Sequence, residues 1–528
     1  MRPYSRWDRA GGMGTVVAAL DTRMESRRRG WIAVLSAAAS FLIYAAAALI
    51  IQEDQKFCCE HSSFAAAASN AYYSAPLGKV YSGVLEEFFE GKLSFDEVLA
   101  RASRREIAPG NLLDTTWDGN GIGYMVLASV GLRLFGPHTR SAVLVMLLLM
   151  GMSTLAFLMR YQDTHASIVV VYFTSLTLMA FTPLVWSEIY SMQIPIGGIR
   201  YFSMLAILPA FHLLLECVEA ANVDARWSAR VIALAGGAQV VVLVLAILVR
   251  NSAMPMLAAL AVGAALTAWV NRGIPGAARR ILRISGYFVI IGAMFVSILM
   301  LSVSKGYLRD GRFTETVWHR IFVSVGLNPA WPFGNLREIY DCRSEIPEGL
   351  VPGPTDRNGH CILWLYAAKH DIPPSTVPTL TYGRQYDAAV REAFFEILRL
   401  YPGDVLKTFF YIKPRYIVWS IGTSLDFKLS AHSALNGLLA AALANLLLFA
   451  TFAAPIPSSS TKLHIGITGL FAAFSIIPYI AVWAMPHTSA DLLLCCMVII
   501  GFATVAVVQK AHGLLLSTKS KYPLSQKL

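Results

Sequence analysis

Charged residues are scarce in this chain, and their scarcity excludes an ordinary soluble protein. Asp, Glu, Lys and Arg make up 15% of the 528 residues, whereas a typical soluble domain contains about 25%. Uncharged apolar runs of about 20 residues, long enough to cross a bilayer as a helix, recur along the whole sequence. In hydrocarbon only a helix satisfies every backbone polar group within one segment, so the composition predicts an all-α, polytopic membrane helix bundle.

The motifs of the familiar soluble enzymes are also missing. The sequence contains no HExxH, no P-loop, no paired CxxC and no dinucleotide-binding glycine pattern, so the chemistries that need them have no support. It has no internal repeat and no inverted pair of interrupted spans, and the second absence counts against a secondary transporter. No interleaving of basic and aromatic residues suggests nucleic acid as a partner.

Ten segments have the length and apolarity of membrane spans. They are 31–51, 141–159, 167–187, 195–215, 229–249, 253–270, 283–303, 431–454, 463–485 and 489–509. Two more segments, 121–135 and 408–424, are ambiguous. Lys413, Pro414 and Arg415 make the second of these better suited to an interfacial helix than to a span. The first span is expected to remain as an anchor, because it lacks a convincing cleavage site.

Basic residues predict the orientation of the spans. RMESRRRG (23–30) precedes the first span, NRGIPGAARRILR (271–283) joins two central spans, and a basic tail (509–528) closes the chain. Ten spans place these three segments on one face, as the positive-inside rule requires. We therefore expect a multi-pass protein, of the bacterial inner membrane, with both termini cytoplasmic. Most of the basic residues behind the net charge of +11 would then anchor the spans on the cytoplasmic side.

This topology divides the chain into five parts. They are a cytoplasmic segment, 1–30; a first membrane bundle, 31–303, with an outer loop at 52–140; an extracytoplasmic region, 304–430; C-terminal membrane helices, 431–509; and a cytoplasmic tail, 510–528. Both outer segments contain stretches with apolar residues at helical spacing, so short helices are expected there. The pattern in the second outer segment breaks at Pro402-Gly403. Loops are where a rigid scaffold usually presents its chemistry.

Four carboxylates are expected on the outer face. They are Glu53 and Asp54 directly after the first span, Asp118 before the next apolar segment, and Glu188 at the end of the third span. Structural alternatives exist: Asp118 would serve equally well as a helix N-cap. Glu53 and Asp54 would serve as a solvated helix end, where a carboxylate gains little from the helix dipole. A low-dielectric surface can shift the pKa values of such groups, which makes them catalytic candidates.

Polar and cationic residues on the same face are candidates for substrate binding. Arg200 lies just inside the fourth span, where a charge is costly and often functional, unless its long side chain reaches the headgroups. Lys413 and Arg415 could bind an anion or could anchor the chain to lipid headgroups. His319 could hydrogen-bond a sugar or a diphosphate, or could be a plain surface histidine. Three further candidates of this kind are Asp341, Tyr386 and Asp387.

Four of the seven cysteines fall in the outer segments. They are Cys58, Cys59, Cys342 and Cys361, and an oxidising compartment would allow them to form disulfides. Cys342 and Cys361 bracket a Pro/Gly-rich stretch and are the expected pair, although one sequence cannot give the connectivity. The other three lie in or beside spans, where cysteine usually acts as a small apolar residue.

Two parts of the chain resemble the GT-C superfamily of integral-membrane glycosyltransferases. The first is WDGNGIGYMVLASVGLRLFG (117–136), which is similar to a segment of the protein O-mannosyltransferase and aminoarabinose-transferase branch. The second is TVWHRIFVSVGLNPAWPFG (316–334) with YDAAVREAFFEILRLYPGDVLKTF (386–409). The commonest family pattern has an Asp-Glu pair a short way into the first outer loop. This chain departs from it, because it has only Glu53-Asp54 directly beside the span.

The resemblance implies transfer of a sugar from a polyprenyl-phosphate donor in the membrane to a lipid, glycan or protein acceptor outside. A carboxylate would deprotonate the acceptor hydroxyl, and the choice between Asp118 and the Glu53-Asp54 pair stays open. A cation or a divalent metal would stabilise the departing phosphate, although the sequence requires no metal. The alternative is a transporter or flippase of lipid-linked saccharides, which charges in the middle of several spans would favour. A weaker third reading is an assembly scaffold.

The predicted topology can be tested by cysteine labelling. Single cysteines introduced at Ser103 and Ser375 should react with a membrane-impermeant reagent added outside, because both positions lie in outer segments. A cysteine at Ser520 should react only after the membrane is opened. Labelling of intact cells at position 520 would mean that 408–424 is a span.

Overall fold

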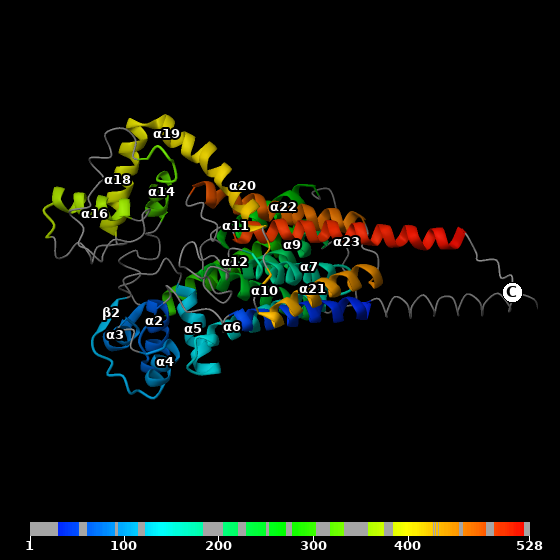
Figure 1. Cartoon of the computed structure of the whole chain (residues 1–528), viewed down its shortest axis with the longest axis horizontal. Coiled ribbons are helices and arrows are strands. Elements are labelled where there is room, and N and C mark those ends of the chain that lie inside the picture. The colour runs from blue at the N-terminus through cyan, green and yellow to red at the C-terminus, as the bar shows by residue number, and fades with distance from the viewer. Residues whose placement is uncertain are drawn as a thin grey trace, which may run out of the picture.

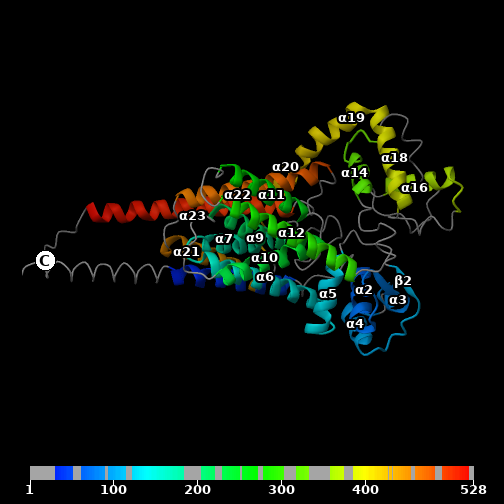
Figure 2. The same ribbon diagram turned by 180° about the vertical axis from the view of Figure 1, so that it is seen from behind.

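A computed structural model gives the fold of most of the chain. It describes residues 30–51, 61–89, 93–114, 122–182, 204–219, 229–249, 253–270, 277–302, 317–331, 357–373, 384–425, 427, 429–430, 432–453, 458–481 and 490–521. Most of these residues form helices. Figures 1 and 2 show a long bundle that carries two smaller helical units at one of its ends.

The bundle contains the long apolar helices. Its described members are Gly30–Ile51, α6 (Arg140–Tyr161), α7 (Ala166–Met179), α9 (Ile207–Glu219), α10 (Ala229–Val249), α11 (Met254–Val270), α12 (Ala277–Ser302), α21 (Ser433–Phe452), α22 (Ser458–Ala481) and α23 (Ala490–Lys521). Leu35, Leu155, Val289 and Leu447 are examples of large apolar side chains that remain exposed on the bundle's outside. Exposed apolar side chains on long uncharged helices are what a bilayer would cover. The chain is a multi-pass helical membrane protein.

The predicted spans are confirmed in part. Six described helices are long and apolar enough to cross a membrane: Gly30–Ile51, Arg140–Tyr161, Val231–Val249, Ser433–Phe452, Ser459–Ile477 and Asp491–Leu515. The other four predicted spans coincide with shorter apolar segments of 10–17 residues, so the number ten stays a prediction. The ambiguous segment 121–135 forms α5 (Ile122–Phe135), whose 14 residues reach only about 21 Å, well short of a bilayer core. The segment 408–424 is not among the candidate spans of the described chain.

The two ends of the bundle differ. We call the end that carries the two units the domain end and the opposite end, where the helix Gly30–Ile51 begins and α23 ends, the tail end (Figure 1). At the tail end, a Cβ added to Gly30 would lie 3.5 Å from Asp163 in the turn between α6 and α7. The two basic-flanked ends of the chain therefore point the same way, which agrees with an even number of crossings.

The first unit is built from residues 61–135. It comprises α2 (His61–Tyr73), β1 (Lys79–Tyr81), α3 (Ser82–Phe89), α4 (Phe95–Ser103), β2 (Leu112–Asp114) and α5. The strands pair antiparallel with Val80 opposite Leu113, a two-stranded sheet that the sequence did not suggest. A capping box starts α4, because Ser94 accepts from the backbone of Glu97 while the Glu97 carboxylate accepts from the backbone of Ser94.

The second unit is built from residues 317–424. It comprises α14 (Val317–Val325), α16 (Arg357–Lys369), α18 (Arg384–Leu400), α19 (Pro402–Lys407), the π-helical turn η5 (Thr408–Ile412) and α20 (Lys413–Ser424). The break predicted at Pro402-Gly403 is confirmed: α18 ends at Leu400, and Pro402 begins α19, where its missing N–H costs nothing. This unit has a hydrophobic core of its own, which includes Phe322, Val390 and Ile397.

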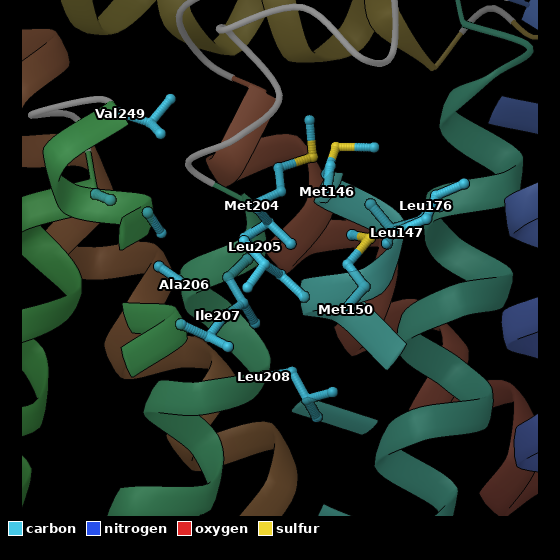
Figure 3. Close-up of a cluster of buried hydrophobic side chains, with 14 of the residues drawn as sticks. Met146, Leu147, Met150, Leu176, Met204, Leu205, Ala206, Ile207, Leu208 and Val249 are labelled. Atoms are coloured by element: carbon cyan, nitrogen blue, oxygen red, sulfur yellow. The ribbon is translucent and has the colours of Figure 1, made fainter. Parts of the chain in front are cut away.

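A group of apolar side chains lies in the domain-end half of the bundle core. Figure 3 shows them: Met146, Leu147 and Met150 from α6, Leu176 from α7, Met204, Leu205 and Ala206 just before α9, Ile207 and Leu208 at its start, and Val249 at the end of α10. Each of these residues is at most 8% exposed. We call this group the apolar cluster.

Gly123 gives a test of how the first unit is seated on the bundle. A Cβ at this position would lie 2.5 Å from the carbonyl carbon of Leu248 at the domain end of α10. Gly123→Ala should therefore force α5 away from α10 and destabilise the protein by about 1–3 kcal/mol, the usual cost of overpacking. The midpoint of thermal unfolding in detergent measures the effect. Gly437→Ala on α21, where a Cβ meets nothing within 4 Å, is the control and should not lower the midpoint.

Candidate functional site

Most of the predicted site residues lie outside the described part of the chain. These are Glu53, Asp54, Asp118, Glu188, Arg200 and Cys342, together with the further candidate Asp341. The described candidates are His319, Lys413, Arg415 and Cys361, together with Tyr386 and Asp387. All six belong to the second unit; five of them fall into two groups at different places in it, and Cys361 of α16 lies apart.

The first group is a buried histidine–tyrosine pair between α14 and α18. His319 Nδ1 and the Tyr386 hydroxyl share a short hydrogen bond, and the two side chains are 6% and 0% exposed. Gly359 of α16 borders both: a Cβ there would lie 3.1 Å from His319 Nδ1. His319 is therefore not a surface histidine, because it joins three helices in the interior of the unit.

Asp387 is the chemically most distinctive member of this group. Its carboxyl group is half-buried, and burial raises its pKa. The backbone N–H of Trp318, at the first turn of α14, donates to the carboxylate and acts in the opposite direction, as do the nearby Arg391 and His319. One oxygen, Oδ1, has no hydrogen-bond partner among the described residues. Asp387 thus combines partial access to solvent with a carboxyl group that can take up a proton more readily than usual.

The second group is centred on Lys413, where the second unit meets the bundle. The Lys413 side chain is 0% exposed. Its Nζ donates to Ser324 Oγ of α14 at 2.7 Å and to the carbonyl oxygen of Ile480 of α22 at 2.9 Å. It also lies over the ring of Phe409, 3.6 Å from the centroid. Lys413 therefore ties the unit to a membrane helix, and its amine faces no solvent from which a phosphate ligand could reach it.

Arg415 lies on the other side of the same helix and is exposed. Its neighbours on the exposed surface are mostly apolar and aromatic: Leu406, Phe410, Tyr411, Val418 and Trp419 are each at least half exposed. A helix with aromatic and basic side chains on one face is typical of a membrane interface. The prediction that 408–424 is interfacial agrees with this surface, and headgroup anchoring remains the role that fits Arg415.

The structure does not bring His319 and Lys413 into one site. His319 lies near the start of α14, and Ser324, which binds Lys413, lies five residues further along the helix. Five residues of an α-helix span about 7.5 Å, so the two groups occupy opposite ends of α14. Both residues were predicted as substrate-binding candidates, and the packing holds them apart.

Cys361 is disulfide-bonded and 1% exposed. Its predicted partner, Cys342, lies outside the described residues, so the pairing stays a prediction. Cys217, Cys495 and Cys496, which lie in or beside predicted spans, are described and are not disulfide-bonded.

A set of polar side chains inside the bundle was not predicted from the sequence. His212 Nε2 lies 3.3 Å from Glu216 Oε1, and both side chains are essentially buried. Gln239 of α10 and Tyr287 of α12 contact the pair. Glu216 lies one residue beyond the predicted span 195–215, and the sequence analysis did not single it out. A histidine and a glutamate four residues apart in an apolar helix were the signal in the sequence that could have revealed this pair.

None of the family models, curated proteins or solved structures compared with this chain is similar to it. Within the described residues, no three His, Cys, Asp or Glu side chains are arranged to hold a metal ion.

Lys413 makes the stability of the protein depend on pH. Burial lowers its pKa from 10.5 to about 6, so between these values the unfolded chain binds a proton that the folded protein lacks. The free energy of unfolding should therefore rise with pH across this window, by at most about 1.4 kcal/mol per pH unit. Below about pH 6 both states are protonated and the dependence ends.

Thermal unfolding in detergent at a series of pH values measures this dependence. Lys413→Met should remove the rise while keeping the buried volume. Lys369→Met is the matched control, because Lys369 is exposed on α16 and pairs with Glu392. Equal pH dependence in the parent and Lys413→Met would show that Lys413 is not the titrating group.

Proposed function

We propose that this protein is a membrane glycosyltransferase that moves a sugar from a polyprenyl-phosphate donor to a lipid, glycan or protein acceptor. The observation that carries the proposal is the position of both helical units at one end of a membrane bundle (Figure 2). A lipid-linked donor lies at the membrane surface, and an acceptor approaches from solution. An enzyme that joins them needs structured segments where the bundle meets water, and both units are in that position.

In the first unit, the segments on either side of Asp118 in the sequence support the proposal. Asp114 ends β2 and Ile122 begins α5, each four residues from Asp118 in the sequence. The α5 helix is seated on α10 at Gly123 and Leu248. Both flanks are thus anchored at the domain end, where a base acting on a membrane-borne substrate would be needed. Asp118, Asp54 and Glu53 are the proposed catalytic carboxylates, with Glu188 and Arg200 as proposed ligands of the donor.

The second unit adds groups that suit an acceptor or a headgroup. Asp387 offers a half-buried carboxyl group beside His319, and Arg415 offers an exposed guanidinium on an aromatic surface. Arginine binds phosphate with two parallel hydrogen bonds. Lys413, which is fully buried, is proposed to hold this unit in position and not to bind the donor directly.

The central test is the replacement of the proposed base. Asp118→Asn keeps the size and the capping ability of the side chain but removes its basicity. In proteoliposomes supplied with a panel of polyprenyl-phosphate sugars, transfer should fall by about a hundredfold or more, the scale of general-base catalysis. Expression and thermal stability should stay at the parent's values.

Glu53→Gln and Asp54→Asn are the matched variants of the same assay. Full activity in Asp118→Asn together with loss in Asp54→Asn would move the base to Asp54. Unchanged transfer in all three variants would contradict catalysis by these carboxylates, and absence of transfer by the parent with every donor would contradict the proposed function.

A second candidate function is a transporter or flippase of lipid-linked saccharides. The buried His212–Glu216 pair favours it, because ionisable residues inside a membrane bundle usually mark a pathway. The two functions are separated by the fate of the donor. A transferase moves the sugar to an acceptor, whereas a flippase changes the leaflet of an intact donor, which an impermeant sugar-oxidising reagent detects.

A further inference from the structure

The short apolar helix α5 contacts the domain ends of two membrane helices. A Cβ added to Gly123, in its first turn, would lie 2.5 Å from the carbonyl carbon of Leu248, at the end of α10. A Cβ added to Gly131, two turns later, would lie 2.5 Å from the carbonyl oxygen of Ser141, in the first turn of α6. Backbone packs against backbone at both places, so α5 connects the end of α10 to the start of α6.

The two contacts lie at nearly the same height along the bundle. The Ser153 hydroxyl of α6 donates to Gln239 Oε1 of α10 at 2.6 Å, which gives the two helices a common reference level. At about 1.5 Å per residue, α10 rises about 14 Å from Gln239 to Leu248. By the same measure, α6 rises about 18 Å from Ser153 to Ser141. The contacts therefore differ in height by about 4 Å, while the glycines that make them are about 12 Å apart along α5. Figures 1 and 2 agree that α5 runs across the long axis of the bundle.

The outer side of α6 shows where the hydrocarbon of the membrane ends. Leu148, Met152 and Leu155 are exposed at helical spacing on this 22-residue candidate span. Arg140, its first residue, lies on the same stripe and is exposed. The helix is about 33 Å long, close to the thickness of a hydrocarbon core, about 30 Å. A long cationic side chain at the end of an apolar stripe belongs among the headgroups, so the domain-end limit of the hydrocarbon lies at the first turn of α6.

The second unit gives the same limit independently, on the other side of the bundle. Lys413, at the start of α20, donates to the carbonyl oxygen of Ile480, one residue before the end of α22. Arg415, two residues further along α20, is exposed, as a side chain among headgroups would be. Figures 1 and 2 show α6 and α22 on opposite sides of the bundle. The membrane surface therefore passes through the domain end at the level of α5.

The last turns of α5 expose apolar side chains at this level. Val130, Leu134 and Phe135 are 40%, 63% and 40% exposed, whereas the first two turns of the helix are mostly buried. Arg133, among them, is exposed as well. Only residues 136–139 separate this turn from Arg140. We call Val130, Arg133, Leu134, Phe135 and Arg140 the corner surface, and it continues the lipid-facing side of α6.

The turn between α5 and α6 is fixed by its own hydrogen bonds. Gly136 has φ +94°, a conformation that suits glycine, and its carbonyl oxygen accepts from the Ser141 hydroxyl at 2.6 Å. The backbone N–H of Thr139 donates to the Asp96 carboxylate of α4 at 2.7 Å. The last turn of α5 is thus held against both α4 and α6, and the exposure of its apolar side chains is a property of the fold.

We propose that α5 lies in the plane of the membrane and that the corner surface binds the phospholipids of the leaflet at the domain end. Leu134 and Phe135 enter the upper part of the acyl chains, and Arg133 remains among the phosphate groups. One guanidinium nitrogen of Arg133, Nη2, donates to the backbone carbonyl of Asn70 at 2.8 Å, and a guanidinium has further N–H groups that suit a phosphate. The first unit then rests on the bilayer. This contact is independent of the proposed sugar transfer.

A lipid suits the corner surface better than a second copy of this chain does. A stable protein interface buries about 800 Å² on each partner, and the corner surface offers three apolar side chains. Acyl chains are fluid and need no matching shape, so they can cover three side chains as readily as a whole helix. The surface also continues the side of α6 that lipid covers.

Photo-crosslinking in phosphatidylcholine vesicles tests the contact. A p-benzoylphenylalanine that replaces Leu134 in the full-length chain should form an adduct with the lipid on illumination, which mass spectrometry detects. The same replacement of Leu148 is the reference within the hydrocarbon and should also give an adduct. Leu112 of β2 is the matched control, because it is 40% exposed in the same unit but β2 lies on the side away from the bundle. Its replacement should give no lipid adduct.

The acyl carbons that are attacked report the depth of each position. From position 134 they should be those nearest the glycerol, and from position 148, about 12 Å beyond Arg140, those nearer the chain end. Attack at the chain end from both positions would mean that α5 enters the bilayer, and it would overturn the in-plane position. If the replacement of Leu134 disturbs folding, Val130 is replaced instead, with the same expectation.

Two other outcomes would also overturn the proposal. If position 148 gives a lipid adduct and position 134 gives none, the corner surface faces water. If position 134 joins two copies of the chain instead, the occupant is a second copy and not a lipid.

Discussion

Inside a membrane bundle every polar group must find its partner within the protein. No water is available in the hydrocarbon to replace a missing hydrogen bond. The backbone meets this requirement by forming helices, and the side chains meet it locally. Thr154, Thr177 and Thr468 each donate to the carbonyl oxygen four residues earlier in their own helix. Asn445 of α21 instead donates to the backbone of Ser36 and links two helices far apart in the sequence.

The same requirement explains the two unusual buried groups. Lys413 is tolerated in the interior because a serine hydroxyl and a backbone carbonyl accept from it and because its amine can lose its proton. Glu216 hydrogen-bonds the Tyr287 hydroxyl of α12 and lies 3.3 Å from His212. Each of the two groups therefore joins helices that are distant in the sequence.

The apolar cluster lies between two parts of the molecule with different chemistry. On its domain-end side, the two units and their anchoring helices provide structured surfaces for the proposed transfer at the membrane surface. On its tail-end side lie the buried His212–Glu216 pair and the hydrogen-bonded His165 and His464.

Several features of this fold follow from the sequence alone, because they depend on contiguous residues. The length of an apolar run determines whether a helix can cross a bilayer, and the apolar runs of the sequence located the six long helices. Pro402 ended one helix and began the next for a reason contained in its own ring. The prediction that 408–424 is interfacial rests in the same way on the side chains of one helix.

The rest was decided by contacts between distant parts of the chain. Gln239 and Ser153 are 86 residues apart, and His165 and His464 are 299 residues apart, so no local pattern could reveal either pair. Burial of His319 and Lys413 likewise depends on which helices pack around them. Both were expected on a surface, because a lone polar residue in a sequence carries no record of its neighbours. A side chain's protonation and its access to a ligand are properties of its surroundings, and only the tertiary structure supplies these.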